Sequence, residues 1–133
     1  MKGLKKILFL CVGNTCRSQM AEGFARYYGK GLAQVRSAGT AACGFVNPTT
    51  IEMMREKGID ISAQSSEQVT DEMVEWADTV VTLGCCSADM VCPVTYLGGK
   101  EDWPIDDPLG MGEEFFRRVR DDIEERVRRL IEP

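Results

Sequence analysis

The sequence predicts an α/β fold: a parallel sheet of four strands in the flavodoxin-like order 2-1-3-4, with helices on both faces. Three observations support this prediction. The chain opens with an uninterrupted apolar run, apolar segments then alternate with helical patterns, and the connections are short. Short connections and right-handed crossovers favour the order 2-1-3-4. Because no linker, repeat or low-complexity segment interrupts the pattern, we expect residues 1–133 to form one domain.

The first three elements are expected between residues 4 and 37. Leu4–Val12 is apolar at successive positions, which is typical of a central parallel strand buried on both faces. Ser18–Tyr28 has the helical pattern and ends before Gly29. Ala33–Ser37 is a short second strand, closed by Gly39.

Capping signals locate the next two helices. Asn47 and Pro48 are typical of the N-cap and first turn of a helix, which Gly58 ends. Thr70 caps a third helix, because two acidic residues follow it where the helix dipole favours negative charge.

The last elements are two strands and a long helix. Thr79–Leu83 and Val94–Leu97 are the predicted third and fourth strands. Gly112–Glu132 is predicted as the final helix, because its apolar residues recur on one stripe. That stripe consists of Phe116, Val119, Ile123, Val127 and Leu130. Ion pairs are expected along the outer face at Glu114–Arg118, Glu124–Arg128 and Glu125–Arg129.

Composition narrows the class of protein. Sixteen basic and 21 acidic residues give a net charge of −5, so neither nucleic acid nor a charged membrane surface is an expected partner. The apolar run near the N-terminus is too short for a secretory signal or a membrane span. Six cysteines without such a signal indicate reduced thiols in the cytoplasm. The absence of histidine excludes mechanisms that depend on a Cys-His or Ser-His-Asp pair.

The predicted site lies where the first strand meets the first helix. Five residues separate Cys11 from Arg17, and a strand-to-helix loop of this kind can turn its backbone N–H groups toward an oxyanion. Gly13 and Asn14 are residue types that tolerate positive φ in such a loop. Arg17 adds a planar fork that matches two oxygens of a tetrahedral anion. The same positive field favours the thiolate form of Cys11.

The loop sequence Cys11-Val-Gly-Asn-Thr-Cys-Arg-Ser18 resembles the phosphate loop of the low-molecular-weight protein tyrosine phosphatase superfamily. Its continuation Gln19-Met-Ala-Glu-Gly23 resembles the thioredoxin-coupled arsenate reductase branch, since the phosphatases usually carry proline first. The resemblance implies that Cys11 is the nucleophile and that Ser18 bonds to its sulfur, although Ser18 could simply cap the helix. It implies oxyanion binding by Val12, Gly13, Asn14, Thr15, Cys16, Arg17 and Ser18.

One further residue, Asp107, takes a role from this resemblance. Asp107 directly precedes Pro108, and the matching aspartate of the family is the general acid that protonates the departing oxygen. An aspartate before proline can equally start a turn. We interpret Cys16 as a packing residue, and we assign Cys43 no function.

A second group of cysteines follows the third strand. In the order 2-1-3-4, topology alone brings Cys85 and Cys86 near Cys11. The resemblance maps the second and third redox cysteines of the reductases onto Cys85 and Cys92, which would form a disulfide. The adjacent Cys86 departs from the pattern, so either neighbour could attack, although the position directly after the strand favours Cys85. A zinc site is disfavoured, because the spacing is not C-x2-C and histidine is absent.

These observations predict a monomeric arsenate reductase that uses Cys11, Arg17 and Asp107 with the disulfide-forming Cys85 and Cys92. The expected partners are arsenate, or a phosphate-like oxyanion, and thioredoxin or a similar thiol reductant. The alternatives are a small phosphatase and a thiol sensor that binds arsenite or a metal. No cofactor is required. Some reductases hold a potassium ion behind the loop, and the matching positions here are Asn14, Glu22 and Ser37, with Glu67 in place of an aspartate.

Overall fold

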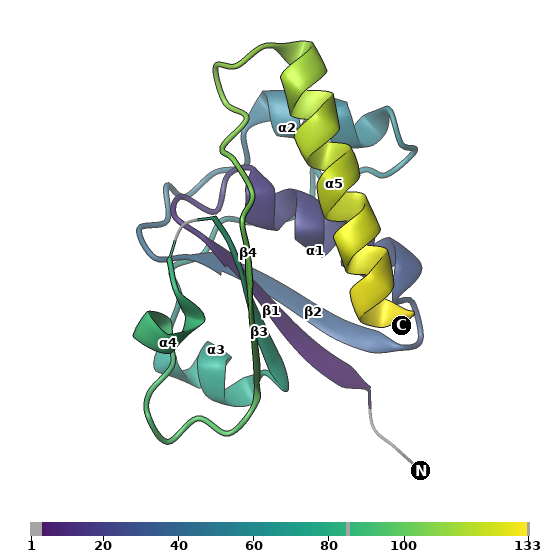
Figure 1. Cartoon of the computed structure of the whole chain (residues 1–133). Coiled ribbons are helices and arrows are strands. Elements are labelled where there is room, and N and C mark those ends of the chain that lie inside the picture. The colour runs from purple at the N-terminus through teal and green to yellow at the C-terminus, as the bar shows by residue number, and fades with distance from the viewer. Residues whose placement is uncertain (1–3, 85, 133) are drawn as a thin grey trace.

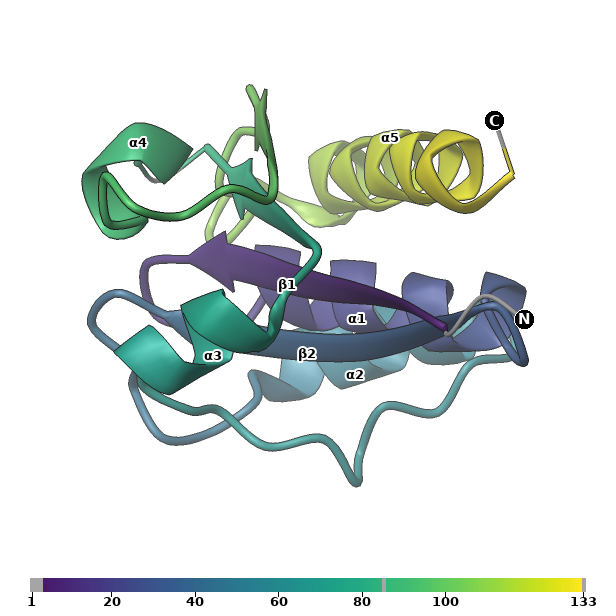
Figure 2. The same cartoon turned by 90° about the horizontal axis from the view of Figure 1, so that it is seen from below.

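The computed structural model describes residues 4–84 and 86–132, which form a four-stranded parallel sheet between two layers of helices (Figures 1 and 2). The strands are β1 (Lys5–Cys11), β2 (Ala33–Gly39), β3 (Thr79–Leu83) and β4 (Gly99–Trp103), in the order β2-β1-β3-β4. The helices are α1 (Arg17–Tyr28), α2 (Pro48–Arg55), α3 (Asp71–Trp76), α4 (Ala88–Val91) and α5 (Glu113–Ile131). The predicted fold class and strand order are confirmed.

Strand β1 lies in the middle of the sheet and divides its side chains between two cores. Ile7 and Phe9 pack into the core formed with α1, α2 and α5. Leu8 and Leu10 pack into the core formed with α3 and α4. All four side chains are completely buried, which is why the run is apolar at every position rather than at alternate ones. The carboxyl ends of β1 and β3 therefore lie side by side, as predicted.

Local signals define α2 and α3 correctly. The side chain of Asn47 accepts a hydrogen bond from the backbone of Thr49 at 2.9 Å. The hydroxyl of Thr70 accepts one from the backbone of Met73 at 3.2 Å. Both predicted N-caps are confirmed, because capping depends only on residues within one turn of the cap.

The predicted position of the fourth strand is wrong. Val94 and Thr95 form a turn, and the side chains of Val94 and Leu97 are 102% and 97% exposed. Strand β4 lies further along the chain and pairs with β3 from Gly99 to Trp103. Its first four residues are exposed and include three charged side chains, because it is an edge strand. Backbone pairing holds such a strand, and charges protect its free edge, so apolar content does not reveal it.

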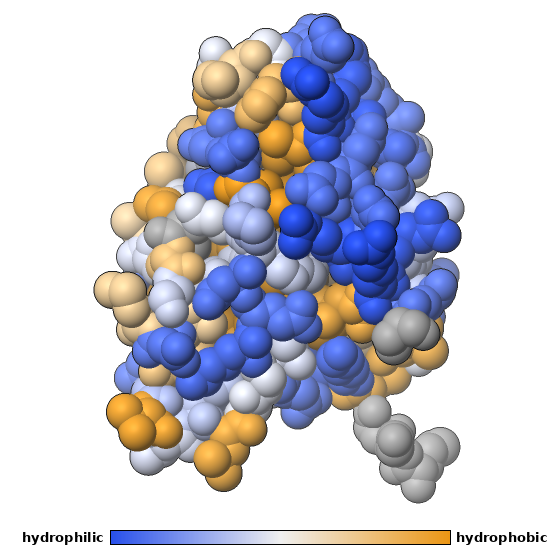
Figure 3. Space-filling view, viewed as in Figure 1, coloured by the Kyte–Doolittle hydropathy of each residue, from blue (hydrophilic) through white to orange (hydrophobic). Residues whose placement is uncertain are grey.

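Helix α5 is amphipathic, and its outer face forms a continuous hydrophilic surface (Figure 3). Its buried stripe consists of Phe116, Val119, Ile123 and Val127, with Leu130 partly buried. Of the predicted pairs, Glu125–Arg129 is confirmed at 2.5 Å. Glu124 contacts Lys57 at 3.1 Å, and Arg128 lies over an aromatic ring of α1. No helix in the described part of the chain is long and apolar enough to span a membrane.

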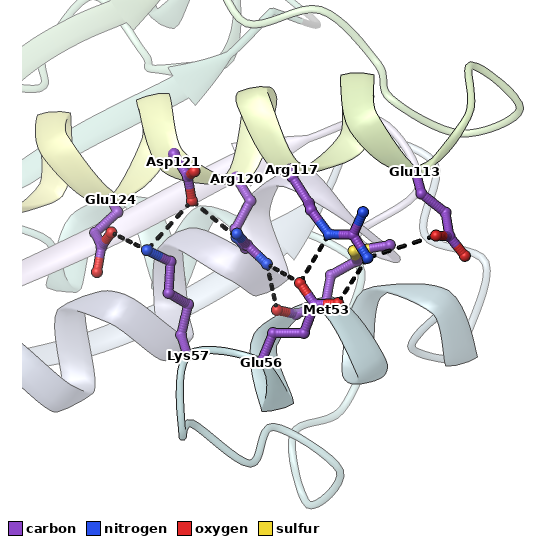
Figure 4. A network of polar contacts seen from close by, with 8 residues as sticks. All are labelled: Met53, Glu56, Lys57, Glu113, Arg117, Arg120, Asp121 and Glu124. Carbon is purple, nitrogen blue, oxygen red and sulfur yellow. Dashed lines mark hydrogen bonds and ion pairs between the residues drawn. The ribbon is translucent and has the colours of Figure 1, made fainter.

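A network of charged side chains ties α5 to the end of α2 (Figure 4). Arg120 is 6% exposed and donates to the carboxylate of Glu56 at 2.7 Å and to the carbonyl oxygen of Met53 at 3.0 Å. Arg117 donates to both oxygens of the same carboxylate, at 3.0 and 2.9 Å. The hydrogen bonds from Arg117 and Arg120 lower the pKa of Glu56 from 4.5 to about 2. The network holds α2 and α5 together where both pack on α1.

Candidate active site

The loop after β1 joins the last residue of the strand to the first residue of the helix. Cys11 ends β1 and Arg17 begins α1, so the intervening residues turn at the carboxyl edge of the sheet. The N-cap residue, Cys16, makes no side-chain capping hydrogen bond. The N–H groups of the first turn can therefore bind an anion at the positive end of the helix dipole.

Close backbone packing shapes this loop. Asn14 has a φ of 53°, but among the described loop residues it alone adopts a positive φ, so the expectation that Gly13 shares this conformation is wrong. Gly13 lies in a tight place, because a Cβ there would lie 3.1 Å from Cys43 Sγ. A Cβ on Gly39, at the end of β2, would lie 2.4 Å from the carbonyl oxygen of Val12. The two glycines let neighbouring segments close around the loop.

The side chains of Cys11 and Ser18 meet beneath the loop. Cys11 is 3% exposed, and its Sγ lies 2.8 Å from Ser18 Oγ. Asn14 supports the Ser18 hydroxyl in this contact. Its Oδ1 accepts the backbone N–H of Glu67 at 2.9 Å, so its Nδ2 must face the hydroxyls. That amide donates to Ser18 Oγ at 2.7 Å and to Ser37 Oγ at 3.0 Å, so the Ser18 hydroxyl keeps its own proton and can donate it to a Cys11 thiolate. A hydrogen bond donated to sulfur favours the thiolate.

Arg17 is held by the segment that follows β4. Its side chain is buried, and Nη1 donates to the carbonyl oxygen of Ile105 at 3.1 Å. Gly84, after β3, makes room for this contact and has a φ of 75°. A Cβ on Gly84 would lie 1.9 Å from the Ile105 oxygen and 2.8 Å from Arg17 Nη1. The bond orients the guanidinium, whose other donors can meet an oxyanion.

Asp107 lies two residues beyond this anchor and is exposed. Its Oδ1 accepts the backbone N–H of Leu109 at 3.1 Å, so the aspartate also makes the turn that its position before proline permits. Burial raises the pKa of Cys16 to about 12, and the charges of Asp107 and Cys11 contribute to the rise. Cys16 stays a protonated thiol at neutral pH, in agreement with a packing role.

Of the second group of cysteines, the structure describes Cys86 and Cys92, which lie on either side of α4. Cys85 lies outside the described residues, and Cys86 is partly exposed. Cys92 follows α4 and is 6% exposed within the second core, where burial raises the pKa of its thiol. The start of α4 is held by the neighbouring edge strand, since Asp102 of β4 accepts the backbone N–H of Ala88 at 2.8 Å.

The residues that match the potassium site of some reductases come together, but their oxygen atoms already have donors. Arg26 Nε donates to one oxygen of the Glu22 carboxylate at 2.8 Å, and Ser37 donates to the other at 2.5 Å. Asn14 Oδ1 accepts the backbone N–H of Glu67. A guanidinium therefore provides the positive charge next to Glu22. These residues do not fit a potassium ion.

A parallel sheet that ends in a Cys-x5-Arg loop, with a buried thiol next to a serine hydroxyl and a buried arginine at the start of the following helix, defines the phosphate-loop class of thiolate enzymes. The model of the family "low molecular weight phosphotyrosine protein phosphatase" matches residues 6–133. The chain belongs to this family.

Its similar relatives place it in the arsenate reductase branch of the family. An arsenate reductase of Brevibacillus brevis is 44% identical over 133 residues, covering 99% of this chain and 98% of the relative. The solved structure of an arsenate reductase in the phosphate binding state is 43% identical, with a TM-score of 0.85 and coverage of 96% and 97%. The thioredoxin-dependent arsenate reductase of Corynebacterium glutamicum is 31% identical, with a TM-score of 0.81, covering 97% of this chain and 61% of that one.

Three contributors to the site escape sequence reasoning. Ile105 acts through a backbone carbonyl, which no residue type reveals. Gly84 could have been found, since a glycine directly after a predicted strand suggests positive φ or a close approach. Arg26 could have been found as the residue four positions after Glu22 on a predicted helix.

Proposed function

We propose that this chain is an arsenate reductase in which Cys11 is the nucleophile and Arg17 and the loop from Val12 to Ser18 bind arsenate. The observation that carries the proposal is the buried Cys11 sulfur, which lies 2.8 Å from the Ser18 hydroxyl under a loop suited to an oxyanion. Arsenate and phosphate are both tetrahedral oxyanions, so the similarity to a reductase in a phosphate binding state supports this use of the loop.

The first half of the cycle forms a sulfur–arsenic bond. The Cys11 thiolate attacks arsenic, and one arsenate oxygen departs as water with the proton that Asp107 supplies. Arg17 and the backbone N–H groups stabilise the charge that develops on the remaining oxygens. Asp107 lies two residues after Ile105, whose carbonyl oxygen accepts from Arg17, and this placement supports its role as the acid.

The second half transfers two electrons. The Cys85 thiolate attacks the Cys11 sulfur, the sulfur–arsenic bond breaks, and its electron pair stays on arsenic, which leaves as arsenite. Cys92 then attacks Cys85, releasing the Cys11 thiolate and leaving a Cys85–Cys92 disulfide. A dithiol reductant of the thioredoxin type reduces this disulfide by thiol exchange. Because the cycle starts from reduced thiols, we place it in the cytoplasm.

The surface around Cys92 supports docking of a reductant. Met90, Val94 and Leu97 are 84%, 102% and 97% exposed on the segment that carries α4 and leads to β4. Figure 3 shows apolar side chains protruding where this connection lies. Exposed apolar side chains next to a redox-active thiol are suited to a protein partner.

The decisive experiment is arsenate-dependent oxidation of a thioredoxin system by the intact protein, with each cysteine replaced by serine in turn. We expect the variants at Cys11, Cys85 and Cys92 to be inactive in turnover, while those at Cys16 and Cys43 remain active. Turnover by Cys85→Ser and not by Cys86→Ser would transfer the second redox role to Cys86. Aryl phosphate hydrolysis without any thiol oxidation by arsenate would favour a phosphatase.

A further inference from the structure

A chain of hydrogen bonds runs from the surface to the Cys11 sulfur behind the anion loop. Arg26 Nε donates to Glu22 Oε2 at 2.8 Å, and Arg26 Nη2 donates to the carbonyl oxygen of Val35 at 3.0 Å. Ser37 Oγ donates to the other oxygen of Glu22 at 2.5 Å. The Asn14 amide then donates to Ser37 Oγ and to Ser18 Oγ, and the Ser18 hydroxyl contacts the Cys11 sulfur. In order, the chain consists of Arg26, Glu22, Ser37, Asn14, Ser18 and Cys11.

The carboxylate in this chain creates an electrostatic problem for the site. Glu22 is 6% exposed and lies behind a loop that must hold both a thiolate and an oxyanion. An uncompensated negative charge there would oppose both, and its own burial would be costly. The Arg26 guanidinium, on the same helix one turn later, cancels that charge.

We propose that Arg26 is a positioning residue that replaces a metal ion behind the loop. By neutralising Glu22, it holds Ser37 and Asn14 in the orientation in which Ser18 can donate its hydrogen bond to the Cys11 thiolate. It also keeps the loop receptive to oxyanions. The inference rests on the proposed role of Cys11 as a thiolate nucleophile. It also implies that the site works without potassium, in contrast to the reductases that hold this ion.

A second arginine beside Glu22 provides a matched control. Arg36 and Arg26 line the same hollow of about 420 Å³, together with Glu22, Ser37, Asp60 and Glu67. The Arg36 guanidinium lies over the ring of Trp76, 5.6 Å from its centroid. Replacing Arg36 therefore removes the same charge from the same hollow without breaking the chain. If positive charge around the hollow were sufficient, without the hydrogen bond from Arg26 to Glu22, both substitutions would lower Cys11 reactivity and phosphate affinity.

The test measures alkylation of Cys11 by iodoacetamide, followed by peptide mass spectrometry, at several pH values and with inorganic phosphate as protectant. Because the Arg26 side chain is half exposed, solvent screens the pair, and we expect Arg26→Gln to reduce alkylation and phosphate affinity by about two- to fivefold. Arg26→Lys should restore most of the loss. Arg36→Gln should resemble the wild type. The double variant Glu22→Gln/Arg26→Gln should show higher alkylation and phosphate affinity than Arg26→Gln alone, because it no longer carries the Glu22 charge that Arg26 cancels.

Several outcomes would overturn the proposal. They are an unchanged Arg26→Gln variant, an equal loss in Arg36→Gln, no recovery in the double variant, or a wild-type alkylation rate that rises when potassium replaces choline. None of these measurements requires arsenate turnover. A wild-type protein that binds phosphate and alkylates as expected, but oxidises no thioredoxin with arsenate, would refute the proposed function and leave this inference intact.

Discussion

Arg17 Nη1 donates to the carbonyl oxygen of Ile105 at 3.1 Å, which joins the start of α1 to the segment that carries Asp107. The anion-binding arginine and the proposed acid are therefore positioned by one contact. That contact exists only because Gly84 has no side chain between the two groups.

We predict that Gly84→Ala weakens phosphate binding at least tenfold, because the new Cβ would displace the Ile105 carbonyl and release Arg17. The readout is phosphate affinity, measured by calorimetry alongside the melting temperature. Gly31→Ala is the matched control, since Gly31 has a similar φ of 80° and no neighbour within 4 Å of an added Cβ. It should destabilise the protein by about 1 kcal/mol through backbone strain and leave phosphate affinity unchanged. Equal losses of affinity in both variants would refute the positioning role of Gly84.

Arg17→Ala should weaken phosphate binding by roughly 2–4 kcal/mol, or about 30- to 800-fold, because a buried bidentate donor is lost. Arg17→Lys should recover only part of this, since an ammonium lacks the planar fork. Competition between phosphate and arsenate gives the measurement. Unchanged phosphate inhibition in Arg17→Ala would mean that the anion binds elsewhere.

A slow aryl phosphatase activity should accompany the proposed reductase activity, because Cys11, Arg17 and Asp107 suffice for attack on phosphorus. Cys92→Ser should keep this activity within about twofold, since its thiol is buried in the second core, away from the loop. Cys11→Ser should abolish it. The assay is release of an aryl alcohol without added thiol, and its loss in a folded Cys92→Ser variant would assign Cys92 to the anion site.

In the proposed cycle Cys92 leaves the second core to form its disulfide, because its thiol is buried there and a disulfide requires Cα atoms within roughly 4.4–6.8 Å. We expect the oxidised protein to lose hydrogen-exchange protection at the α4 amides of Met90 and Cys92, and at the Ala88 amide that Asp102 holds. Full protection after oxidation would exclude the rearrangement.

If Cys92 resolves the first disulfide, removing its thiol should trap that disulfide. Cys92→Ser should accumulate a Cys11–Cys85 disulfide after one arsenate turnover, because no third thiol is left to resolve it. Peptide mapping identifies the bond. A disulfide from Cys11 to Cys86 would assign the second redox role to Cys86, and one to Cys16 would contradict the inert, protonated state of that thiol.

The α2–α5 network predicts a pH dependence of stability (Figure 4). The pKa of Glu56 is lowered in the folded protein from 4.5 to about 2, so the unfolded state binds the proton more readily. The contribution of Glu56 is therefore complete above pH 4.5 and is lost as the pH falls toward 2. Urea unfolding across this range should show a slope that Glu56→Gln reduces. An identical slope in the variant would mean that Arg117 and Arg120 do not act through Glu56.

Some elements of this fold follow from local sequence, and others depend on pairing with distant parts of the chain. The caps at Asn47 and Thr70 and the buried run of β1 are predictable, because each depends on residues within one turn or one strand. The edge strand β4 is not, because pairing with the backbone of β3 places it regardless of its side chains. A search for apolar content therefore finds Val94–Leu97, which the structure leaves as an exposed connection.

The sequence by itself determined the sheet order, the anion loop between Cys11 and Arg17, and the family to which these belong, since spacing and residue type along the chain suffice for them. Only the tertiary structure decided what supports the loop. The Ile105 carbonyl reaches Arg17 across 88 residues, and Ser37 reaches Asn14 from the neighbouring strand. Such contacts involve backbone atoms and ordinary polar side chains, whose partners are set by how strands and helices pack in space.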